Sequence, residues 1–484
     1  MICSSFDELI NSGYDRYNDV VGIYEKIDGK YVGKTFGEFY TDVRSLAKTL
    51  LGMGLYGKRV MLCGKNSYHW MVSFLAVSAY VGIAVPIDKE WTRNDINNVL
   101  SDLNIDLIFY SGYTEETLAD INSPKANFEN DMVDFIIQGR ELDIVLGAQS
   151  PKRICAMFFT SGTMSAPKKI ELTERNFFVN ADSMAELVSI STNDRYMVSL
   201  PFNHIATIIA NFVYPIYMGA RLYIPNDFKE MSTDLKLIRP TVLYGVPRVF
   251  EKLWETVCAD KKVAGVIKFS NFLRKFGVDI RENLFSKLHE SLGGAIRFAY
   301  NGAAKLDDAI IQAFNEMGLL ILQAYGMTES SAIIACDSAM NYRLGSVGKV
   351  LSNQVCKIIN QDENDIGEIY VKGENVAECA IAADGYLHTG DLGYIDGGGY
   401  LFIVGRNKRL IKLSNAKNVY PDELEELLTR NKEILRARVY EKDGCISAKI
   451  VSGCEYETVH NIVEMLNKTL PHYMQIRQIT VNSL

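Results

Sequence analysis

The sequence has few features of an extracellular or zinc-binding protein. Its nine cysteines stand singly between Cys3 and Cys454, and no Cys-x-x-Cys pair occurs among them. Disulfide frameworks and structural zinc sites use cysteines that are paired at short spacing. The opening residues, MICSSFDELINSGYD, contain neither a basic start nor an apolar run, so no secretory signal is expected. These absences favour a cytoplasmic protein.

Excess positive charge is also lacking. The chain has 51 Lys and Arg residues against 59 Asp and Glu residues, which gives a formal net charge of -8. Binding to DNA or RNA depends on many phosphate contacts from basic side chains. We therefore expect no nucleic-acid partner and favour a small-molecule substrate.

No uninterrupted apolar run is suited to cross a membrane. The uncharged stretch from Trp70 to Ile87 is long enough to do so, but a glycine and a proline interrupt it. It fits a buried helix over Trp70–Tyr80 followed by a buried strand over Ile83–Ile87. We expect no transmembrane segment. Peripheral membrane association stays open, although no amphipathic stretch requires it.

A chain of 484 residues exceeds the roughly 250 to 300 residues at which single cores stop growing, so two or more domains are expected. Short apolar strand candidates alternate with helical patterns, which is typical of an α/β fold with largely parallel, buried sheets. The expected strands are Val60–Cys63, Leu107–Tyr110, Cys155–Phe159, Tyr196–Leu200, Thr241–Tyr244, Ile296–Tyr300 and Leu319–Gln323.

The pattern changes at about Gly345 to short strands separated by turn residues, which indicates a β-rich subdomain over about 345–405. A hairpin is expected there, with strands Leu392–Ile395 and Tyr400–Val404 on either side of Asp-Gly-Gly-Gly. A charged stretch and a new helix follow Arg406. We therefore predict an N-terminal domain over 1–405 and a small C-terminal domain over 406–484.

A loop rich in hydroxyl groups and basic residues follows one expected strand. Its sequence, FFTSGTMSAPKK, covers Phe158 to Lys169. Hydroxyls and backbone N–H groups that converge on one point, with a lysine beside them, suit the oxygens of a triphosphate. Pro167 stands where a Walker A motif has its second glycine, which disfavours a P-loop NTPase. A phosphate-binding loop is the favoured interpretation, and a polar surface turn is the alternative.

The loop resembles the T-S-G-T-T-G-x-P-K signature of the adenylate-forming (AMP-binding) superfamily. This superfamily groups acyl-CoA synthetases, peptide-synthetase adenylation domains and firefly luciferase. Further segments resemble family motifs and follow in the family's order: Leu200–His204, Asn301–Ala304, Tyr325–Glu329 and Tyr386–Asp391. The stretch Tyr244–Lys252, YGVPRVFEK, is similar to a segment of long-chain fatty acyl-CoA ligases. The resemblance therefore implies a carboxylic acid substrate, and a fatty acid in particular.

The resemblance also implies a fold and a set of catalytic residues. Two α/β subdomains and the β-rich subdomain would form the large domain, and a mobile α+β domain would follow. Thr328 would contact phosphate and Glu329 would hold Mg²⁺, roles that suit a hydroxyl and a hard oxygen ligand. His204 would border the acyl-binding tunnel. Lys408 would be the hinge for rotation of the small domain.

The nucleotide contacts implied by the resemblance come from four separate segments. The phosphate loop, the turn beneath the adenine, the aromatic motif and the last β-rich strands would all contribute. Asp391 would accept hydrogen bonds from the ribose hydroxyls, and Arg406 would approach the ribose or phosphate. The implied cofactor-binding residues are Thr160, Ser161, Gly162, Thr163, Lys168, Gly302, Ala303, Ala304, Tyr325, Gly326, Asp391 and Arg406.

The implied reaction is ATP-dependent activation of a carboxylic acid through an acyl-adenylate, followed by transfer to coenzyme A with release of AMP and pyrophosphate. ATP, Mg²⁺ and coenzyme A are thus the expected cofactors and co-substrate. Two alternatives stay open. One is a stand-alone adenylation enzyme that loads an acyl carrier protein, and the other is a nucleotide-binding or acyl-adenylate-binding protein without turnover.

The family's terminal lysine motif is not found in the 484 residues. The segment Leu470–Met474 resembles the approach to that motif, and the chain ends at Leu484. We interpret the C-terminal domain as truncated, because the other motifs are largely present. A degraded relative is the alternative.

Overall fold

The computed structural model describes residues 3–160, 168–258, 263–412, 418–442, 445–471 and 474–482. Residue contacts divide the chain into two compact units. The first unit combines Met1–Val355 with Lys372–Leu387, and the second combines Cys356–Val371 with His388–Leu484. The domain boundary expected between residues 405 and 406 stays a prediction.

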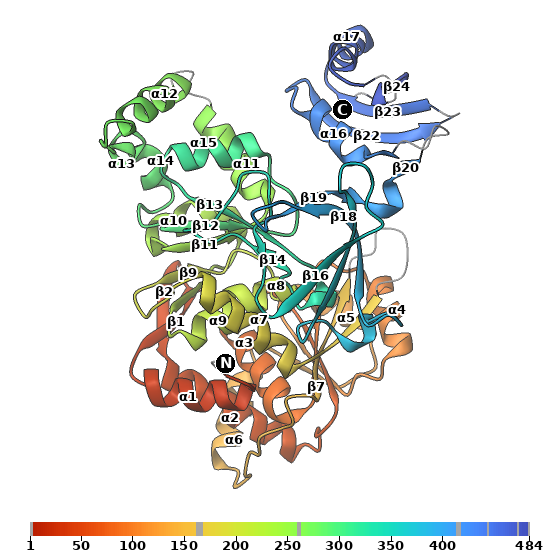
Figure 1. Cartoon of the computed structure of the whole chain (residues 1–484). Coiled ribbons are helices and arrows are strands. Elements are labelled where there is room, and N and C mark those ends of the chain that lie inside the picture. The colour runs from red at the N-terminus through yellow and green to blue at the C-terminus, as the bar shows by residue number, and fades with distance from the viewer. Residues whose placement is uncertain are drawn as a thin grey trace. The chain divides into compact units, whose positions relative to one another are not determined.

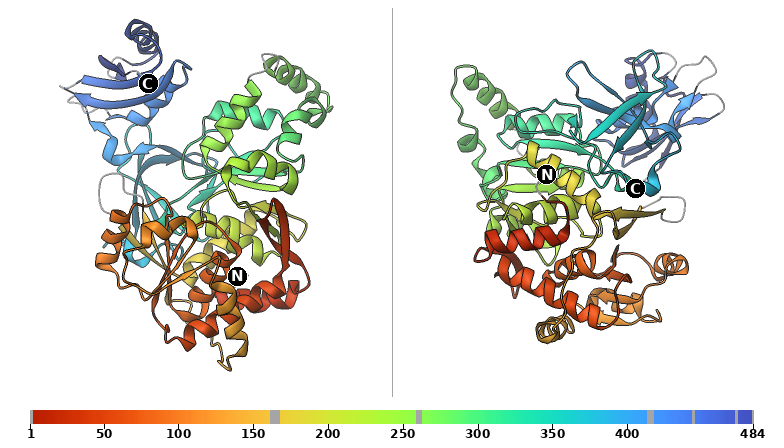
Figure 2. Two further views of the ribbon diagram at one scale, coloured as in Figure 1. Left: turned by 180° about the vertical axis from the view of Figure 1, so that it is seen from behind. Right: turned by 60° about the horizontal axis from the view of Figure 1, so that its bottom comes forward.

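The first unit contains a large sheet that is mostly parallel (Figure 1). A short antiparallel ribbon, β1 and β2, forms one edge, where β1 pairs in parallel with β10 (Figure 2). Within the described residues the large sheet has nine strands, in the spatial order β15 (Lys349–Val350), β14 (Ala335–Cys336), β13 (Ile321–Tyr325), β12 (Phe298–Asn301), β11 (Val242–Gly245), β9 (Arg195–Met197), β10 (Arg221–Ile224), β1 (Val21–Ile27) and β2 (Lys30–Thr35).

A second sheet of the same unit is also largely parallel, and only β8 pairs antiparallel among its described strands. Its described strands, in spatial order, are β6 (Lys125–Asn127), β5 (Leu107–Tyr110), β3 (Arg59–Cys63), β4 (Ile83–Ile87), β7 (Ile154–Thr160) and β8 (Lys168–Thr173).

The central strands are apolar throughout because both faces of each sheet are covered. In β3, Val60 and Leu62 join the main hydrophobic core, whereas Met61 and Cys63 join a separate cluster on the opposite face. Alternate side chains of a strand point to opposite faces, so two covered faces require two sets of apolar residues. This explains why continuous apolar runs marked the strands in the sequence.

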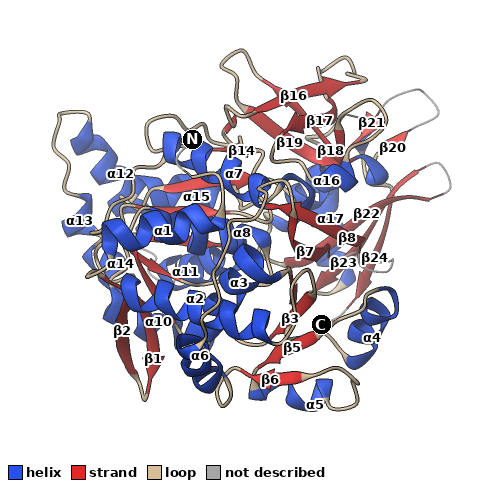
Figure 3. Cartoon of the chain, turned by 90° about the horizontal axis from the view of Figure 1, so that it is seen from below, coloured by secondary structure: helices blue, strands red, loops and turns tan. Residues whose placement is uncertain are grey.

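Helices cover these sheets, and Figure 3 separates them from the strands by colour. The expected helix from Trp70 to Tyr80 is present as α3 and a following π-helical turn, η1, over Val77–Val81. The α-helices of this unit are α1 (Phe6–Tyr17), α2 (Phe36–Gly52), α3 (Tyr68–Ala76), α4 (Arg93–Asp102), α5 (Glu115–Leu118), α6 (Met132–Glu141), α7 (Glu174–Leu187), α8 (Ile205–Ile208), α9 (Tyr214–Tyr217), α10 (Met231–Ile238), α11 (Pro247–Cys258), α12 (Val263–Arg274), α13 (Arg281–Leu284), α14 (Ser286–Ser291) and α15 (Asp308–Glu316).

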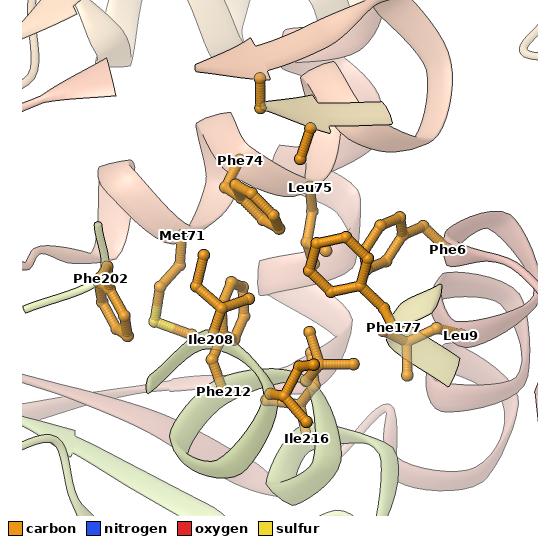
Figure 4. Packing of buried hydrophobic residues seen from close by; sticks show 14 of the residues in the cluster. Phe6, Leu9, Met71, Phe74, Leu75, Phe177, Phe202, Ile208, Phe212 and Ile216 are labelled. Atoms are coloured by element: carbon orange, nitrogen blue, oxygen red, sulfur yellow. The ribbon is translucent and has the colours of Figure 1, made fainter. Parts of the chain in front are cut away.

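The main core lies between the two sheets and is rich in phenylalanine (Figure 4). Phe6 of α1 packs edge-on against Phe177 of α7 and Phe74 of α3, at centroid distances of 5.3 and 6.0 Å. Phe74 also contacts Phe212, which belongs to a π-helical turn before α9. Edge-to-face ring pairs of this kind add to the free energy gained from apolar burial. Helices from distant parts of the chain thus hold the two sheets together.

The second unit contains most of a four-stranded sheet and a smaller α+β part. Two strands of that sheet, β16 and β17, have some of their residues in the first unit. In the latter, α16 and α17 bury apolar side chains against a three-stranded sheet. The described elements are β16 (Gln354–Ile359), β17 (Gly367–Gly373), β18 (Leu387–Ile395), β19 (Leu401–Arg406), β20 (Ile411–Lys412), β21 (Asn418–Val419), α16 (Pro421–Thr429), β22 (Ile434–Lys442), β23 (Cys445–Ser452), α17 (Tyr456–Asn467) and β24 (Gln478–Asn482).

Candidate nucleotide-binding site

Two of the predicted motifs leave the large sheet at the same edge. Gly245, Asn301 and Gln323 are neighbours in register on the parallel strands β11, β12 and β13. The chain segments that follow β12 and β13 therefore both start at the carboxyl edge. Crevices outside the carboxyl ends of parallel strands are where α/β proteins bind their ligands.

The turn after β12 presents its backbone at the surface. Ala303 has a φ of 67°, and both it and Ala304 are exposed. The N–H of Gly302 donates to the carbonyl of Gly245 at 3.0 Å. A Cβ added to Gly302 would come within 2.4 Å of the Tyr244 hydroxyl, so this position leaves little room for a side chain. Small residues here suit the close approach of a flat ring.

The motif after β13 is held in a tight turn. Tyr325 ends the strand and is half-buried, and Thr328–Ser330 forms a 3₁₀ turn. A Cβ on Gly326 would lie 1.9 Å from the carbonyl oxygen of Ala332, which only glycine avoids. Glu329 is 8% exposed. The turn thus carries a hydroxyl and a carboxylate three and four residues after the aromatic Tyr325.

The phosphate-loop lysine meets the acidic end of this motif. Thr160 and Lys168 are register partners at the ends of β7 and β8. Lys168 Nζ lies 3.9 Å from Glu329 Oε1, which joins the second sheet to the turn that follows β13. Two segments that are 161 residues apart in sequence therefore contribute opposite charges to one place. The predicted residues Ser161, Gly162 and Thr163 lie outside the described residues.

Buried amides hold the acidic turn in place, and sequence analysis missed them. Asn180 of α7 donates to the carbonyls of Ser330 and Ser331. Asn375 donates to the Ser330 carbonyl at 2.9 Å, and the Ser331 hydroxyl donates back to the Asn375 carbonyl at 2.7 Å. Buried polar groups that are paired in this way fix a single geometry. No motif marks Asn180, since an asparagine inside a helical pattern gives no such signal.

A second polar network lies beneath the turn after β12, and its members Gln323 and Asp337 were also missed. The Asn301 side-chain amide donates to Gln323 Oε1 at 2.7 Å. The Gln323 N–H donates to an Asp337 carboxylate oxygen at 3.0 Å. All three residues are buried. Burial raises the pKa of Asp337 to about 7, although the hydrogen bond from the Gln323 N–H acts in the opposite direction.

This raised pKa predicts a pH-dependent stability. Because the folded protein holds the Asp337 proton more tightly than the unfolded chain, this group's contribution to the free energy of unfolding falls as pH rises from the ordinary value near 3.8 to about 7. Asp337→Asn should remove that fall and flatten the profile. Chemical denaturation of both proteins across this pH range measures it.

Asp227→Asn serves as the control, since Asp227 is exposed and a hydrogen bond from the Lys229 N–H lowers its pKa. Its contribution has the opposite sign, because it is present above the ordinary pKa and is lost as pH falls. Identical slopes in wild type and Asp337→Asn would contradict the assignment.

His204 is the residue immediately before α8 (Ile205–Ile208). Its backbone N–H donates to the carbonyl of Pro201 at 3.3 Å, and its side chain is exposed. Its expected place beside an acyl group stays a prediction.

Asp391 and Arg406 are brought together in the second unit. They are register partners on the antiparallel strands β18 and β19, and Arg406 Nε lies 2.7 Å from Asp391 Oδ1. Asp391 is buried while the Arg406 side chain is 61% exposed. Lys408 lies in the short 3₁₀ turn Asn407–Arg409 before β20, and its side chain lies outside what the structure describes. The roles of all three residues stay predictions.

The donor set of the first unit fits a metal-bound triphosphate. Lys168 supplies positive charge, Thr328 a hydroxyl and Glu329 a hard carboxylate ligand. No group of three or more His, Cys, Asp or Glu side chains in the described parts of the chain could hold a metal ion by itself. Magnesium commonly takes one or two carboxylates and completes its shell with phosphate oxygens and water. A single glutamate is therefore compatible with it.

Two largely parallel sheets, with the lysine of the phosphate loop beside the glutamate of the acidic motif, fit an adenylate-forming type of protein. The profile of the AMP-binding enzyme family matches residues 15–379. The chain belongs to this family. The predicted resemblance to the adenylate-forming superfamily is confirmed.

Relatives in this family are named as ligases. The chain is 27% identical to the long-chain-fatty-acid–CoA ligase ACSBG1 of Bos taurus over 90% of its length and 69% of the relative. It is 27% identical to FadD15 of Mycobacterium bovis, also a long-chain-fatty-acid–CoA ligase, over 86% of its length and 77% of the relative. Human ACSBG1 is 27% identical over 85% of this chain, and the match covers 65% of the length of ACSBG1. The expected class, an AMP-forming acid–thiol ligase, is the class of these relatives.

Solved structures confirm the α/β fold and the small C-terminal part. An o-succinylbenzoate coenzyme A synthetase of Bacillus subtilis, in complex with ATP and magnesium ion, superimposes with a TM-score of 0.77 at 20% identity, over 98% of this chain and 95% of that one. A fatty acyl CoA synthetase of Mycobacterium tuberculosis gives a TM-score of 0.71 at 19% identity, over 99% and 94%. In the described residues, no helix has the length and apolar character needed to span a membrane.

Proposed function

We propose that this chain uses ATP to activate a fatty acid and transfers the acyl group to coenzyme A, with release of AMP and pyrophosphate. The observation that carries the proposal is the 3.9 Å approach of Lys168 to Glu329. It unites the phosphate-loop motif with the Tyr325–Glu329 motif, as one triphosphate site requires. The long-chain-like stretch Tyr244–Lys252 and the names of the relatives favour a fatty acid.

The first half-reaction joins the acid to AMP. A carboxylate oxygen attacks the α-phosphorus of ATP, a new P–O bond forms, and the bond to the β-phosphate breaks to release pyrophosphate. Lys168 would neutralise charge on the phosphates, and Thr328 would hold one phosphate oxygen by a hydrogen bond. Mg²⁺, when bound at Glu329, supplies further neutralisation of the triphosphate.

The second half-reaction passes the acyl group to a thiol. The sulfur of coenzyme A attacks the carbonyl carbon, a C–S bond forms, AMP leaves with the electron pair of the C–O bond, and the thiol proton passes to solvent. We propose that Asp391 and Arg406 bind the ribose side of the nucleotide and that Lys408 is the hinge for movement of the small domain between the two steps. His204 would line the acyl tunnel.

Exchange of radiolabelled pyrophosphate into ATP tests this function. A panel of fatty acids of increasing chain length should stimulate exchange, whereas amino acids should not. Adding coenzyme A with a stimulating acid should then yield acyl-CoA and AMP in equal amounts. Exchange without acyl-CoA, but with acylation of an added carrier protein, would favour the carrier-loading alternative. ATP binding in calorimetry with no exchange for any acid would favour a binding protein without turnover.

We also propose a cytoplasmic location for this activity. ATP and coenzyme A are water-soluble, whereas long fatty acids partition into lipid, so the enzyme would draw one substrate from a membrane. Cell fractionation followed by immunodetection of the chain tests this location.

A further inference from the structure

Helix α12 and the turn after it expose a cluster of aromatic side chains. Phe269, Phe272 and Phe276 are 53%, 55% and 70% exposed. The spacing of three residues places Phe269 and Phe272 on one face of α12 (Val263–Arg274), and Phe276 follows in the turn after it. The rings of Phe272 and Phe276 contact each other at a centroid distance of 5.1 Å. Val278, which is 46% exposed, extends the patch beyond the turn.

The opposite face of α12 is the one that packs on the protein. Ile267 and Ser270 are buried, and Val263 and Val266 pack against the cluster that includes Phe314 of α15. The phenylalanines are therefore a second apolar face, which the hydrophobic core does not require. A contiguous exposed patch of large apolar side chains marks an interaction surface. Sequence analysis missed it because apolar residues on both faces of α12 obscure the amphipathic pattern.

The charged residues along α12 and as far as Val278 are all basic. Lys268, Arg274 and Lys275 are exposed, and no Asp or Glu occurs from Val263 to Val278. The next acidic residue along the chain, Asp279, is paired with Arg281 at 2.7 Å. This contrasts with the net charge of -8 for the whole chain. Aromatic side chains with cations beside them match a lipid surface that carries negative head groups.

We propose that the exposed patch formed by Phe269 and Phe272 of α12 and Phe276 of the following turn binds the surface of a membrane that contains anionic lipids. The rings enter the boundary between head groups and acyl chains, and the three cations lie at the level of the phosphates. The proposal does not depend on ligase activity, because vesicle binding is measured without ATP, acid or coenzyme A.

Co-sedimentation with vesicles tests the proposal. The full chain is mixed with vesicles of phosphatidylcholine alone or of phosphatidylcholine with phosphatidylglycerol, and the bound fraction gives a partition coefficient. The wild type should prefer the anionic vesicles and lose this preference at high salt. The triple variant Phe269→Ser, Phe272→Ser, Phe276→Ser should bind anionic vesicles on the order of a hundredfold more weakly.

A second set of substitutions tests the role of the three cations in vesicle binding. Replacing Lys268, Arg274 and Lys275 by Ser should weaken binding to anionic vesicles by about fivefold for each cation removed, and should leave binding to neutral vesicles unchanged. Equal losses on both kinds of vesicle would overturn the assignment of these cations to the lipid phosphates.

A matched control removes three exposed apolar side chains elsewhere in the first unit. Val133, Val145 and Leu237 are 50%, 90% and 58% exposed, and their triple replacement by Ser should leave vesicle binding at the wild-type level. Circular dichroism and thermal melting establish that every variant is folded. Wild-type binding by the phenylalanine variant would overturn the proposal, as would an equal loss in the control. It would also be overturned if the phenylalanine variant only converted an oligomer into a monomer in light scattering, which would make a second copy the occupant.

Discussion

Glu329→Gln is expected to lower ATP–pyrophosphate exchange by about a hundredfold or more, a loss typical of removing one group that stabilises a charged transition state. Glu329 is buried beside Lys168 at the end of the phosphate loop, and a neutral amide oxygen binds magnesium more weakly than a carboxylate does. Calorimetry shows whether the loss of exchange comes from the loss of magnesium binding. Magnesium should strengthen ATP binding by the wild type, and it should no longer do so in the variant.

The neighbouring ion pair on β8 supplies a matched control. Lys169 Nζ lies 2.8 Å from Glu171 Oε1, and Glu171→Gln removes a carboxylate only three positions from Lys168. Exchange and the magnesium effect should survive this change. Lys168→Ala should weaken ATP binding with and without magnesium, because the lysine acts on phosphate and not on the metal. If Glu171→Gln were as damaging as Glu329→Gln, general loss of charge would explain both results and the assigned role of Glu329 would be wrong.

The sheets and one helix were predictable because burial repeats along the chain. The expected strand Leu107–Tyr110 is β5 without any shift, and the expected strand Thr241–Tyr244 is displaced by one residue in β11. The expected helix Trp70–Tyr80 is present as α3 and the π-helical turn after it, which ends at Gly82. Apolar runs and glycine stops are local signals, so a sequence reports them directly.

The support beneath the site was not predictable in the same way. Glu174 looks like an ordinary acidic residue in the first turn of a helix, yet it is 1% exposed and accepts a hydrogen bond of 2.6 Å from the N–H of Phe6. Asn180 and Asp337 are equally unremarkable in sequence, and each gains its role from partners more than ten residues away. Motifs identify residues that would touch the nucleotide, whereas the packing that holds them depends on contacts that only the fold creates.

Gly326→Ala is expected to have the second large effect, on stability and on nucleotide binding together. The new Cβ would lie 1.9 Å from the Ala332 carbonyl oxygen, and that backbone atom cannot rotate away as a side chain would. Overpacking of this kind costs about 1–3 kcal/mol in the free energy of unfolding. The turn that carries Thr328 and Glu329 begins two residues later, so relief of the clash should displace both. Calorimetric binding of ATP with magnesium, and thermal unfolding, measure the two consequences.

Gly112→Ala is the appropriate comparison, because a Cβ there meets nothing within 4 Å and the residue is not in the left-handed region. Both substitutions add one methyl group and reduce the freedom of the unfolded chain to the same extent, which by itself stabilises a protein by about 0.4–1 kcal/mol. Gly112→Ala should therefore be neutral or slightly stabilising and should bind ATP like the wild type. Gly326→Ala should be less stable than the wild type and should bind ATP more weakly. Wild-type affinity of Gly326→Ala for ATP would mean that the turn Thr328–Ser330 can be displaced without loss of binding. The claim that nucleotide binding requires a fixed position of Thr328 and Glu329 would then be wrong.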